Sequence, residues 1–246
     1  MTYNYISNWQ DCVDHILSCY PEEGGGIVTT DNIFIPIVNI SETPLDTFEF
    51  APVELARDDV KCILHSHPYD PNVALDHDPR IPSKTDMQGQ IDTAVEWAIV
   101  ITEGENVTQP VFWGDYSHRP DLFDREFIHN AQDCLAFMSD WQYKNFGLEL
   151  PRLARDFDWF EQGFDYMEDV LEPWGFVDVT HLPEEKGDVV FYKIQSSVVN
   201  HLGVIIEPNR VAHHLFGRFP KSEPTAIWAK YAMKRIRHKT NPAFSR

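Results

Sequence analysis

Short apolar stretches, each bounded by polar or turn-forming residues, occur in two separate groups along this 246-residue sequence. In the first group, apolar residues at helical spacing run over residues 7–20 and stop at Pro21. Residues 27–40 then form two strands with a turn near Asp31-Asn32, and shorter strands follow at 60–64 and 97–101. A helix that opens at Ser83 separates the last two strands, and this alternation predicts a sheet with helices packed against it.

The second group follows residues 108–120, whose prolines, glycine and charges are typical of a linker. A helix is predicted from Asp133, followed by an aromatic and acidic segment at 151–174. Three strands close the chain, at 189–194, 201–206 and 211–216. The length fits two domains of about 120 residues each. We therefore expect an α+β protein with two domains, residues 1–112 and 113–246.

The composition argues against several classes of protein. Twenty Lys and Arg residues against 39 Asp and Glu residues give a net charge of −19, which opposes binding to nucleic acid or to an anionic membrane surface. Four cysteines in so long a chain do not form a disulfide framework, and no pair has C-x-x-C spacing. The first residues do not resemble a signal peptide, and no apolar run approaches the roughly 20 residues that span a bilayer. Synthesis and folding in a cytoplasm are therefore expected.

Two histidines separated by one residue, His65 and His67, stand at the end of a predicted strand. Residues i and i+2 of an extended chain point to the same side, so both imidazoles can reach one ion. Asp86 follows at the start of the helix that Ser83 opens, and Glu23 precedes a run of three glycines. Two histidines, an aspartate and a water form an open tetrahedral zinc site, in which a nearby glutamate can take a proton from the water.

Each of these patterns also has a purely structural interpretation. His-x-His fits surface or partly packed histidines, Glu-Glu after a helix is usually solvated, and Ser83-x-x-Asp86 is the pattern of a helix capping box. Their occurrence together and in this order favours the metal site. The combination resembles the JAMM metallopeptidases, in which a glutamate in a Pro-x-Glu…Gly context precedes His-x-His-Pro and Ser-x-x-Asp.

The resemblance implies a JAMM/MPN-like mixed sheet with helices in residues 1–112. It assigns roles to five residues, with His65, His67 and Asp86 as zinc ligands, Glu23 as general base and Ser83 as a donor to the tetrahedral oxyanion. Glu23, and not Glu22, stands in the position of the catalytic glutamate. Residues 69–82 form a longer insert than the family usually has between its second and third motifs.

A cysteine at the predicted start of a helix, Cys134 after Asp133, is a candidate nucleophile. The free N–H groups and the positive dipole end of a first helical turn lower the pKa of a thiol there. Thiolate chemistry also needs a histidine, and the closing strands contain His201 together with His213 and His214. A lone helical cysteine is more often part of a core and a strand histidine is often packed, but the combination is more specific than either residue.

The geometry of the last hairpin decides between His213 and His214. If Glu207-Pro208-Asn209 is a three-residue loop, residue 206 pairs with residue 210 and Gly203 faces residue 213. His201 then lies on the same face as His213 and diagonal to it, whereas His214 points to the opposite face. A shift of one residue in this register would reverse the choice.

These motifs resemble those of the NlpC-type papain-like cysteine peptidases, with Asp-Cys at a helix start, Gly-Asp-Val-Val-Phe-Tyr at 187–192 and His-x-Gly-Val at 201–204. The resemblance implies a helix packed on an antiparallel sheet in residues 113–246. It also implies that Cys134 attacks the carbonyl, that His201 acts as base and then as acid, and that His213 orients His201. Cys134-Leu135-Ala136 replaces the usual Cys-Ser-Gly and changes the rim beside the nucleophile.

The two motif sets in one chain, with shared stretches at 125–129, 147–151, 156–160 and 213–218, resemble the tail-tip assembly proteins of lambda-like siphophages. The resemblance implies that other tail-tip proteins are partners and that bacterial peptidoglycan is the substrate. It implies assembly in the host cytoplasm, a place in the virion tail tip, action in the host periplasm or envelope, and cleavage between D-glutamate and a diamino acid. Zinc is the one cofactor expected, in the first domain.

Two alternatives to this function stay open. In the first, the protein is a structural component of a tail tip and its active sites are silent. In the second, it is a cellular enzyme that pairs a JAMM isopeptidase with a cysteine peptidase and acts on protein conjugates.

Overall fold

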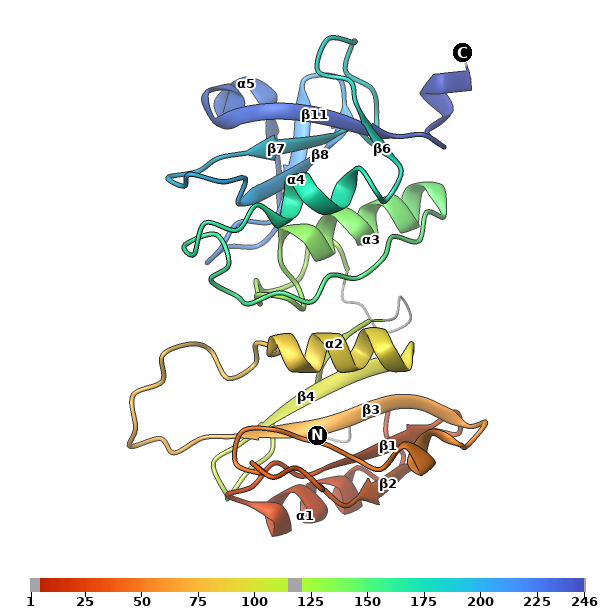
Figure 1. The fold of residues 1–246 in the computed structure, drawn as a ribbon, viewed down its shortest axis with the longest axis vertical. Coiled ribbons are helices and arrows are strands. Elements are labelled where there is room, and N and C mark those ends of the chain that lie inside the picture. Colours follow the sequence, from red (N-terminus) through yellow and green to blue (C-terminus); the bar gives the residue numbers. More distant parts are fainter. Residues whose placement is uncertain (1–4, 115–120, 246) are drawn as a thin grey trace. The chain divides into compact units, whose positions relative to one another are not determined.

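The chain folds as two compact units, Met1–Arg119 and Pro120–Arg246, in a computed structural model that describes residues 5–114 and 121–245 (Figure 1). Helices and sheets occur in both units, which confirms the predicted α+β fold class. Within the described residues, no helix is long and apolar enough to cross a membrane.

The described part of the first unit is built on a mixed five-stranded sheet with the strand order β2-β1-β3-β4-β5. Its strands are β1 (Gly25–Thr29), β2 (Phe34–Ile37), β3 (Val60–Pro68), β4 (Glu96–Thr102) and β5 (Val111–Trp113). Strands β3 and β4 are parallel, and the other neighbours are antiparallel. Strand β3 is longer than predicted and includes both histidines of the metal motif.

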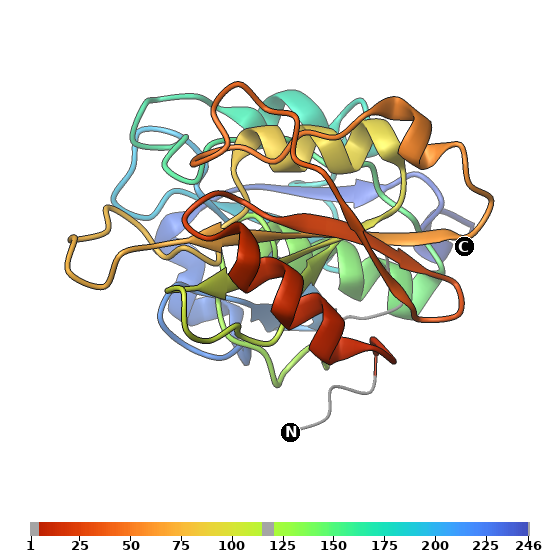
Figure 2. The same ribbon diagram turned by 90° about the horizontal axis from the view of Figure 1, so that it is seen from below.

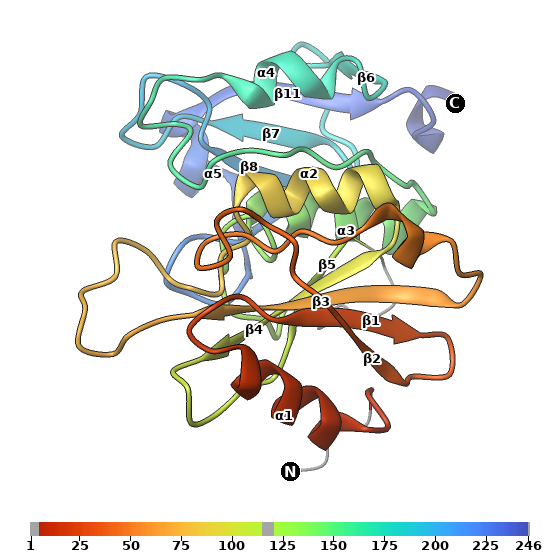
Figure 3. The ribbon, with the colours of Figure 1, turned by 60° about the horizontal axis from the view of Figure 1, so that its bottom comes forward.

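Helices cover both faces of this sheet, as Figures 2 and 3 show. Helix α1 (Trp9–Cys19) packs Cys12 and Ile16 against Cys62 and Leu64 of β3. Helix α2 (Lys84–Thr93) lies on the opposite face, where it contacts Trp97 of β4. A single 3-10 turn, η1 (Pro52–Leu55), precedes β3. Because side chains alternate along a strand, the odd-numbered residues of β3 point away from α1 and towards the α2 face.

The prediction that residues 108–120 form a linker is wrong for residues 111–113, which form strand β5. Its three residues pair with β4, so they belong to the first sheet, and the predicted domain boundary between residues 112 and 113 falls inside the strand. A strand of three residues between Pro110 and Gly114 is too short to show a periodicity of its own. Residues 115–120 of the predicted linker lie outside the described residues.

The second unit contains an antiparallel sheet, six-stranded in its described residues, with the strand order β10-β9-β8-β7-β11-β6. The strands are β6 (Phe176–Asp178), β7 (Val189–Tyr192), β8 (His201–Glu207), β9 (Arg210–His213), β10 (Lys221–Pro224) and β11 (Ala232–His238). The three predicted strands are confirmed as β7, β8 and β9, but the prediction that they alone close the chain is wrong, since it omitted β6, β10 and β11.

Two of the omitted strands, β10 and β11, lack the apolar pattern that marks a strand. Strand β10 reads Lys-Ser-Glu-Pro, and β11, although it lies between β7 and β6, contains two arginines and a lysine. Arg237 of β11 is buried because it pairs with the carboxylate of Asp188, at 2.6 and 3.0 Å. Arg235 also contacts Asp188, at 3.1 Å. An ion pair thus takes the place that an apolar contact occupies in an ordinary strand.

Helices also lie on both faces of the second sheet (Figure 1). The long helix α3 (Cys134–Phe146) packs against Leu202, Val204 and Ala212, together with α4 (Tyr166–Leu171). On the other face, α5 (Thr225–Trp228) and η2 (Ala229–Tyr231) cover Ile205 and Val211. The last turn is η3 (Pro242–Ser245). The alternation along β8 and β9 therefore places His201 and His213 on the α5 face of the sheet.

Candidate active site and candidate metal centre

The candidate nucleophile begins α3, and the residue before it fixes the start of this helix. The carboxylate of Asp133 accepts the backbone N–H groups of Leu135 and Ala136, both at 3.0 Å. Its other oxygen accepts the amide of Asn130 at 2.9 Å and pairs with Arg155. Burial opposes ionisation of Asp133, but Arg155 and the amides outweigh it and lower the pKa of this carboxyl. Asp133 is thus a buried negative charge next to Cys134.

Cys134 is buried beside β8, where the backbone amide of Leu202 lies within hydrogen-bonding reach of its sulfur. Burial, helped by the charge of Asp133, raises the pKa of the thiol to about 12. The predicted lowering of this pKa by the helix start is therefore wrong for the resting protein. Asp133 accepts the first-turn amides that would otherwise stabilise a thiolate, so Cys134 is a neutral thiol that needs a base.

The register of the β8–β9 hairpin agrees with one prediction and corrects another. Gly203 pairs with His213, as expected. The predicted pairing of residue 206 with residue 210 is wrong, because Glu207 pairs with Arg210 and the loop contains only two residues. A β-bulge between Ile205 and Glu207 takes up the extra residue, and this restores the predicted register along the rest of the hairpin.

A chain of polar contacts connects His201 to residues of three other elements. His201 Nε2 lies 2.9 Å from His213 Nδ1, and His213 Nε2 lies 3.1 Å from Glu223 Oε2. The indole N–H of Trp228 donates to the same glutamate oxygen at 2.8 Å. Sequence analysis did not identify Glu223, since only the pairing of β10 with β9 brings it beside His213.

Aromatic rings enclose the two histidines of this chain. The ring of Tyr192 stacks on His201 with a centroid distance of 5.7 Å, and the ring of Trp228 lies 4.6 Å from that of His213. Burial, together with the neighbouring His213, holds the pKa of His201 well below its usual range. His201 is therefore neutral at pH 7, which is the form that can accept a proton. It directly precedes Leu202, whose amide contacts Cys134.

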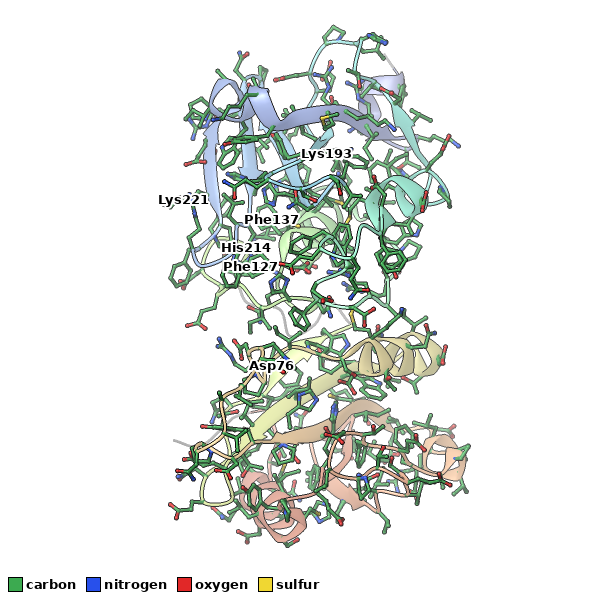
Figure 4. The ribbon with its side chains drawn as sticks, turned by 60° about the vertical axis from the view of Figure 1, so that its left-hand side comes forward. Asp76, Phe127, Phe137, Lys193, His214 and Lys221 are labelled. Atoms are coloured by element: carbon green, nitrogen blue, oxygen red, sulfur yellow. The ribbon has the colours of Figure 1, made fainter. Side chains whose placement is uncertain are left out.

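His214 lies on the other face of the sheet, as the register predicts. Its buried ring lies edge-on to Phe127 and Phe137, with centroid distances of 5.0 and 6.5 Å, and Figure 4 shows these three side chains together. Burial, helped by the charge of Arg125, lowers the pKa of His214 to about 4. His214 is a packed histidine of the α3 face.

We expect this buried histidine to make the second unit less stable in mild acid. Above pH 6.5 the His214 ring is neutral in both the folded and the unfolded protein. Between pH 6.5 and about pH 4 the ring is protonated in the unfolded protein but stays neutral in the folded protein, so acid favours unfolding. From pH 7.5 to 5 this removes about 2 kcal/mol from the free energy of unfolding. Urea unfolding at each pH measures this decrease in the free energy of unfolding, and hydrogen exchange of the α3 amides reports on the second unit. A His214→Leu variant should lack this part of the pH dependence, and a variant with the same dependence as wild type would contradict the assignment.

In the first unit, the histidines of β3 meet the two predicted acidic residues. His65 Nε2 and His67 Nε2 are 3.1 Å apart. The carboxylate of Asp86 lies 3.3 Å from His65 Nε2 and 3.4 Å from His67 Nε2, and Glu23 Oε1 lies 3.9 Å from His67 Nε2. Ligand atoms of Glu23, His65 and His67 all lie within 4.8 Å of one another. Glu22, by contrast, is exposed.

The helix capping box and the cluster of Glu23, His65, His67 and Asp86 are not alternatives, because Asp86 takes part in both. Ser83 Oγ accepts the backbone N–H of Asp86 at 3.0 Å, and the Asp86 carboxylate accepts the backbone N–H of Ser83 at 2.8 Å. This reciprocal pair fixes the carboxylate at the start of α2, where it also faces the histidines. Burial disfavours the charged form of Asp86, but His65 and His67 outweigh it and hold its pKa well below the usual range.

The insert at residues 69–82 contributes to the cluster. The carbonyl of Pro79 lies 2.8 Å from His67 Nδ1. Since a carbonyl can only accept, Nδ1 carries a hydrogen, and in the neutral form of the ring, the form that binds a metal, the lone pair is on Nε2, the atom that faces Asp86. A metal-ligating histidine is usually held in this way by a partner on its other nitrogen.

The cluster fits a tetrahedral zinc ion. Two atoms bound to one zinc at 2.0–2.2 Å lie about 3.3–3.5 Å apart, close to the separations of the histidine nitrogens and the aspartate oxygens. Both carboxylates are buried, and burial raises the pKa of Glu23 although His65 and His67 oppose this. Oε2 of Glu23 has no hydrogen-bond partner among the described residues. Glu23 is thus a buried carboxyl beside the candidate ligands, as a general base requires.

Comparison with known proteins relates the second unit to a family. Residues 110–237, slightly more than half of the chain, match the model of the NlpC/P60 family. This range includes Cys134, His201 and His213. One solved structure, described as similar to lipoprotein, is of an NLP/P60 family protein from Staphylococcus aureus subsp. aureus Mu50. The alignment covers 48% of this chain and 36% of the chain in that structure, with 19% sequence identity and a TM-score of 0.32.

Two relatives align with most of the chain. "Tail tip assembly protein K" of Escherichia phage N15 is 28% identical over 237 residues, which is 92% of this chain and 91% of that protein. "Tail tip assembly protein K" of Escherichia phage lambda is 26% identical over 184 residues, which is 74% of this chain and 83% of that protein.

Proposed function

The chain belongs to the NlpC/P60 family, and from this membership we propose that its second unit is a cysteine endopeptidase that hydrolyses peptide bonds of bacterial peptidoglycan. The observation that carries the proposal is the buried contact of 2.9 Å between His201 and His213, next to the strand amide that reaches the sulfur of Cys134. The neutral ring of His201 and the neutral thiol of Cys134, linked through the backbone amide of Leu202, are the two groups that nucleophilic catalysis by cysteine needs.

In this proposal the thiol proton of Cys134 passes to His201 as the sulfur attacks the carbonyl carbon of the scissile bond. The amide nitrogen then takes that proton from His201 as the C–N bond breaks, which leaves a thioester on Cys134. Water, deprotonated by His201, hydrolyses the thioester and regenerates the thiol. His213 orients His201 throughout. The amide of Leu202 is placed to stabilise negative charge on the sulfur.

We further propose that the protein works in the tail tip of a phage, together with other tail proteins. Both relatives that align with most of the chain bear the name of a tail tip assembly protein. A hydrolase carried by a tail would be assembled in the host cytoplasm and would act on the host envelope. The bond proposed for cleavage joins D-glutamate to a diamino acid in the stem peptide.

Digestion of purified peptidoglycan tests this function. Wild-type protein should release stem-peptide fragments whose masses, measured by mass spectrometry, identify the cleaved bond. Fragments with new termini at D-glutamate and at the diamino acid are expected. An intact wild-type protein that releases no fragments would favour the alternative in which the protein has only a structural role in the tail tip.

A second activity is proposed for the first unit, which we assign as a JAMM-like metallopeptidase domain. The cluster of His65, His67 and Asp86 supports zinc as the bound ion, and Glu23 and Ser83 lie beside this cluster. Bound zinc would supply a water of lowered pKa and a Lewis acid for the substrate carbonyl. Glu23 is positioned to accept a proton from such a water, and Ser83 is proposed to donate to the oxyanion.

A further inference from the structure

We propose that Glu223 is a positioning residue of the cysteine site. Glu223 holds His213 in one tautomer, and His213 in turn keeps the lone pair of His201 on Nδ1. This inference deepens the proposed peptidase function and rests on it for its consequence in catalysis. Its structural part concerns only which nitrogen of each histidine carries the hydrogen, and this can be measured without substrate.

The position of Glu223 follows from strand pairing. Strand β10 pairs with β9 so that Lys221 faces His213 and Glu223 faces Val211. Since side chains alternate, Glu223 lies on the same face of the sheet as Val211 and His213. One oxygen, Oε2, lies 3.1 Å from His213 Nε2 and accepts the indole N–H of Trp228 at 2.8 Å. Two contacts thus hold one oxygen of a side chain that is one-quarter exposed.

The carboxylate decides where the hydrogen of His213 lies. Burial favours the neutral acid, but His213 and Trp228 outweigh it and lower the pKa of Glu223, so the group is ionised at neutral pH. An ionised carboxylate can only accept, so Nε2 of His213 must be the donor. Burial outweighs the contact with Glu223 and lowers the pKa of His213, so its imidazole is neutral and has one N–H group, and His213 Nδ1 is therefore an acceptor.

The same logic extends to His201. Its Nε2 lies 2.9 Å from the accepting Nδ1 of His213, so Nε2 of His201 carries the hydrogen. The lone pair of neutral His201 is then on Nδ1, the nitrogen that does not contact His213. Without Glu223, both rings could reverse together, with His213 Nδ1 as donor and His201 Nδ1 protonated. That second tautomer cannot take a proton from Cys134.

Nitrogen-15 NMR of the imidazole rings at neutral pH tests the structural part. Wild-type protein should show a protonated Nε2 on both His201 and His213. Glu223→Ala should give a mixture of tautomers at both residues. Glu223→Gln should keep the wild-type tautomers, because Trp228 needs an acceptor and so keeps the amide oxygen turned towards both donors. Wild-type tautomers in Glu223→Ala would overturn the proposal.

Kinetics test the consequence for catalysis. Glu223→Ala should lower kcat by about 10- to 100-fold with KM within about twofold, a smaller loss than the roughly 10⁴-fold loss that a fully wrong tautomer causes in a serine protease. Glu223→Gln should stay within about threefold of wild type. Glu207→Ala, which removes an exposed glutamate of β8, is the matched control and should have no effect. Equal losses in Glu223→Ala and Glu223→Gln, with unchanged tautomers in both, would assign the effect to the charge of Glu223 and overturn the positioning role.

A third measurement separates this proposal from the choice of substrate. Alkylation of Cys134 by iodoacetamide, followed by peptide mass spectrometry, also requires a base for the thiol proton. Glu223→Ala should slow this alkylation and Glu223→Gln should not. If peptidoglycan is not cleaved by wild type but the tautomers and alkylation rates behave as expected, the proposed substrate fails and the role of Glu223 stands. If the alkylation rate is the same in all three proteins, the role of Glu223 fails.

Discussion

Replacement of Cys134 by alanine should lower the rate of peptidoglycan cleavage by at least about 10⁴-fold, because no other group can form the thioester. Cys134→Ser should be almost as inactive. The pKa of a hydroxyl is higher still than that of the buried thiol, and a neutral imidazole such as His201 deprotonates it less readily. The measurement is the rate of release of stem-peptide fragments, quantified by mass spectrometry.

The matched control is Cys12→Ala, which removes a buried free cysteine from α1 of the other unit. Its cleavage rate should equal that of wild type. Hydrogen exchange of the α3 amides verifies that Cys134→Ala keeps the fold, since the substitution removes only one buried sulfur atom. Cleavage by Cys134→Ala at the wild-type rate would place the activity elsewhere in the chain and would refute the proposed nucleophile.

The second large effect is expected in the first unit, where replacement of both His65 and His67 by alanine should abolish zinc binding. Wild-type protein purified with zinc should contain about one equivalent, since two histidines and one aspartate form a three-ligand site. The double variant should fall to background, because one carboxylate and a water do not hold the ion. Metal content is measured by atomic emission on protein exchanged into metal-free buffer.

Zinc should also stabilise the folded first unit. At a free zinc concentration 100 times the dissociation constant, the gain is about 2.7 kcal/mol, and a chelator should remove it from wild type and leave the double variant unchanged. His77→Ala is the control, because it removes an exposed histidine of the insert. Wild-type protein that contains no zinc and whose unfolding does not respond to the chelator would contradict the proposed site.

Several parts of the fold were predictable because local patterns specify them. The apolar periodicity of α1 and α3, the apolar runs of β4 and β7, and a turn that includes Asn209 are all visible in the sequence. The strands β10 and β11 were not predictable in this way. Their polar and basic residues become strand residues only because neighbours supply partners, as Asp188 does for Arg237.

In the candidate sites, too, the features that depend on local sequence were predictable and those that depend on tertiary contacts were not. Local spacing alone places His65 and His67 on one face of a strand, and the capping pattern places Asp86 at the start of α2, since both depend on contacts within a few residues. The prediction that a helix start lowers the pKa of Cys134 failed because burial and Asp133 act on the thiol in the folded protein. The register at His213 was correct although the predicted loop was not, because a β-bulge compensated.

By itself, the sequence determined which residues carry reactive groups and which of them share a face of one strand or one turn of a helix. These properties depend on backbone periodicity, which acts over a few residues. Only the tertiary structure decided that Pro79 holds His67, that Leu202 reaches the sulfur of Cys134 and that Glu223 completes the histidine chain. Each of these contacts joins segments whose separation in the chain carries no information about distance, until strand pairing and burial bring them together.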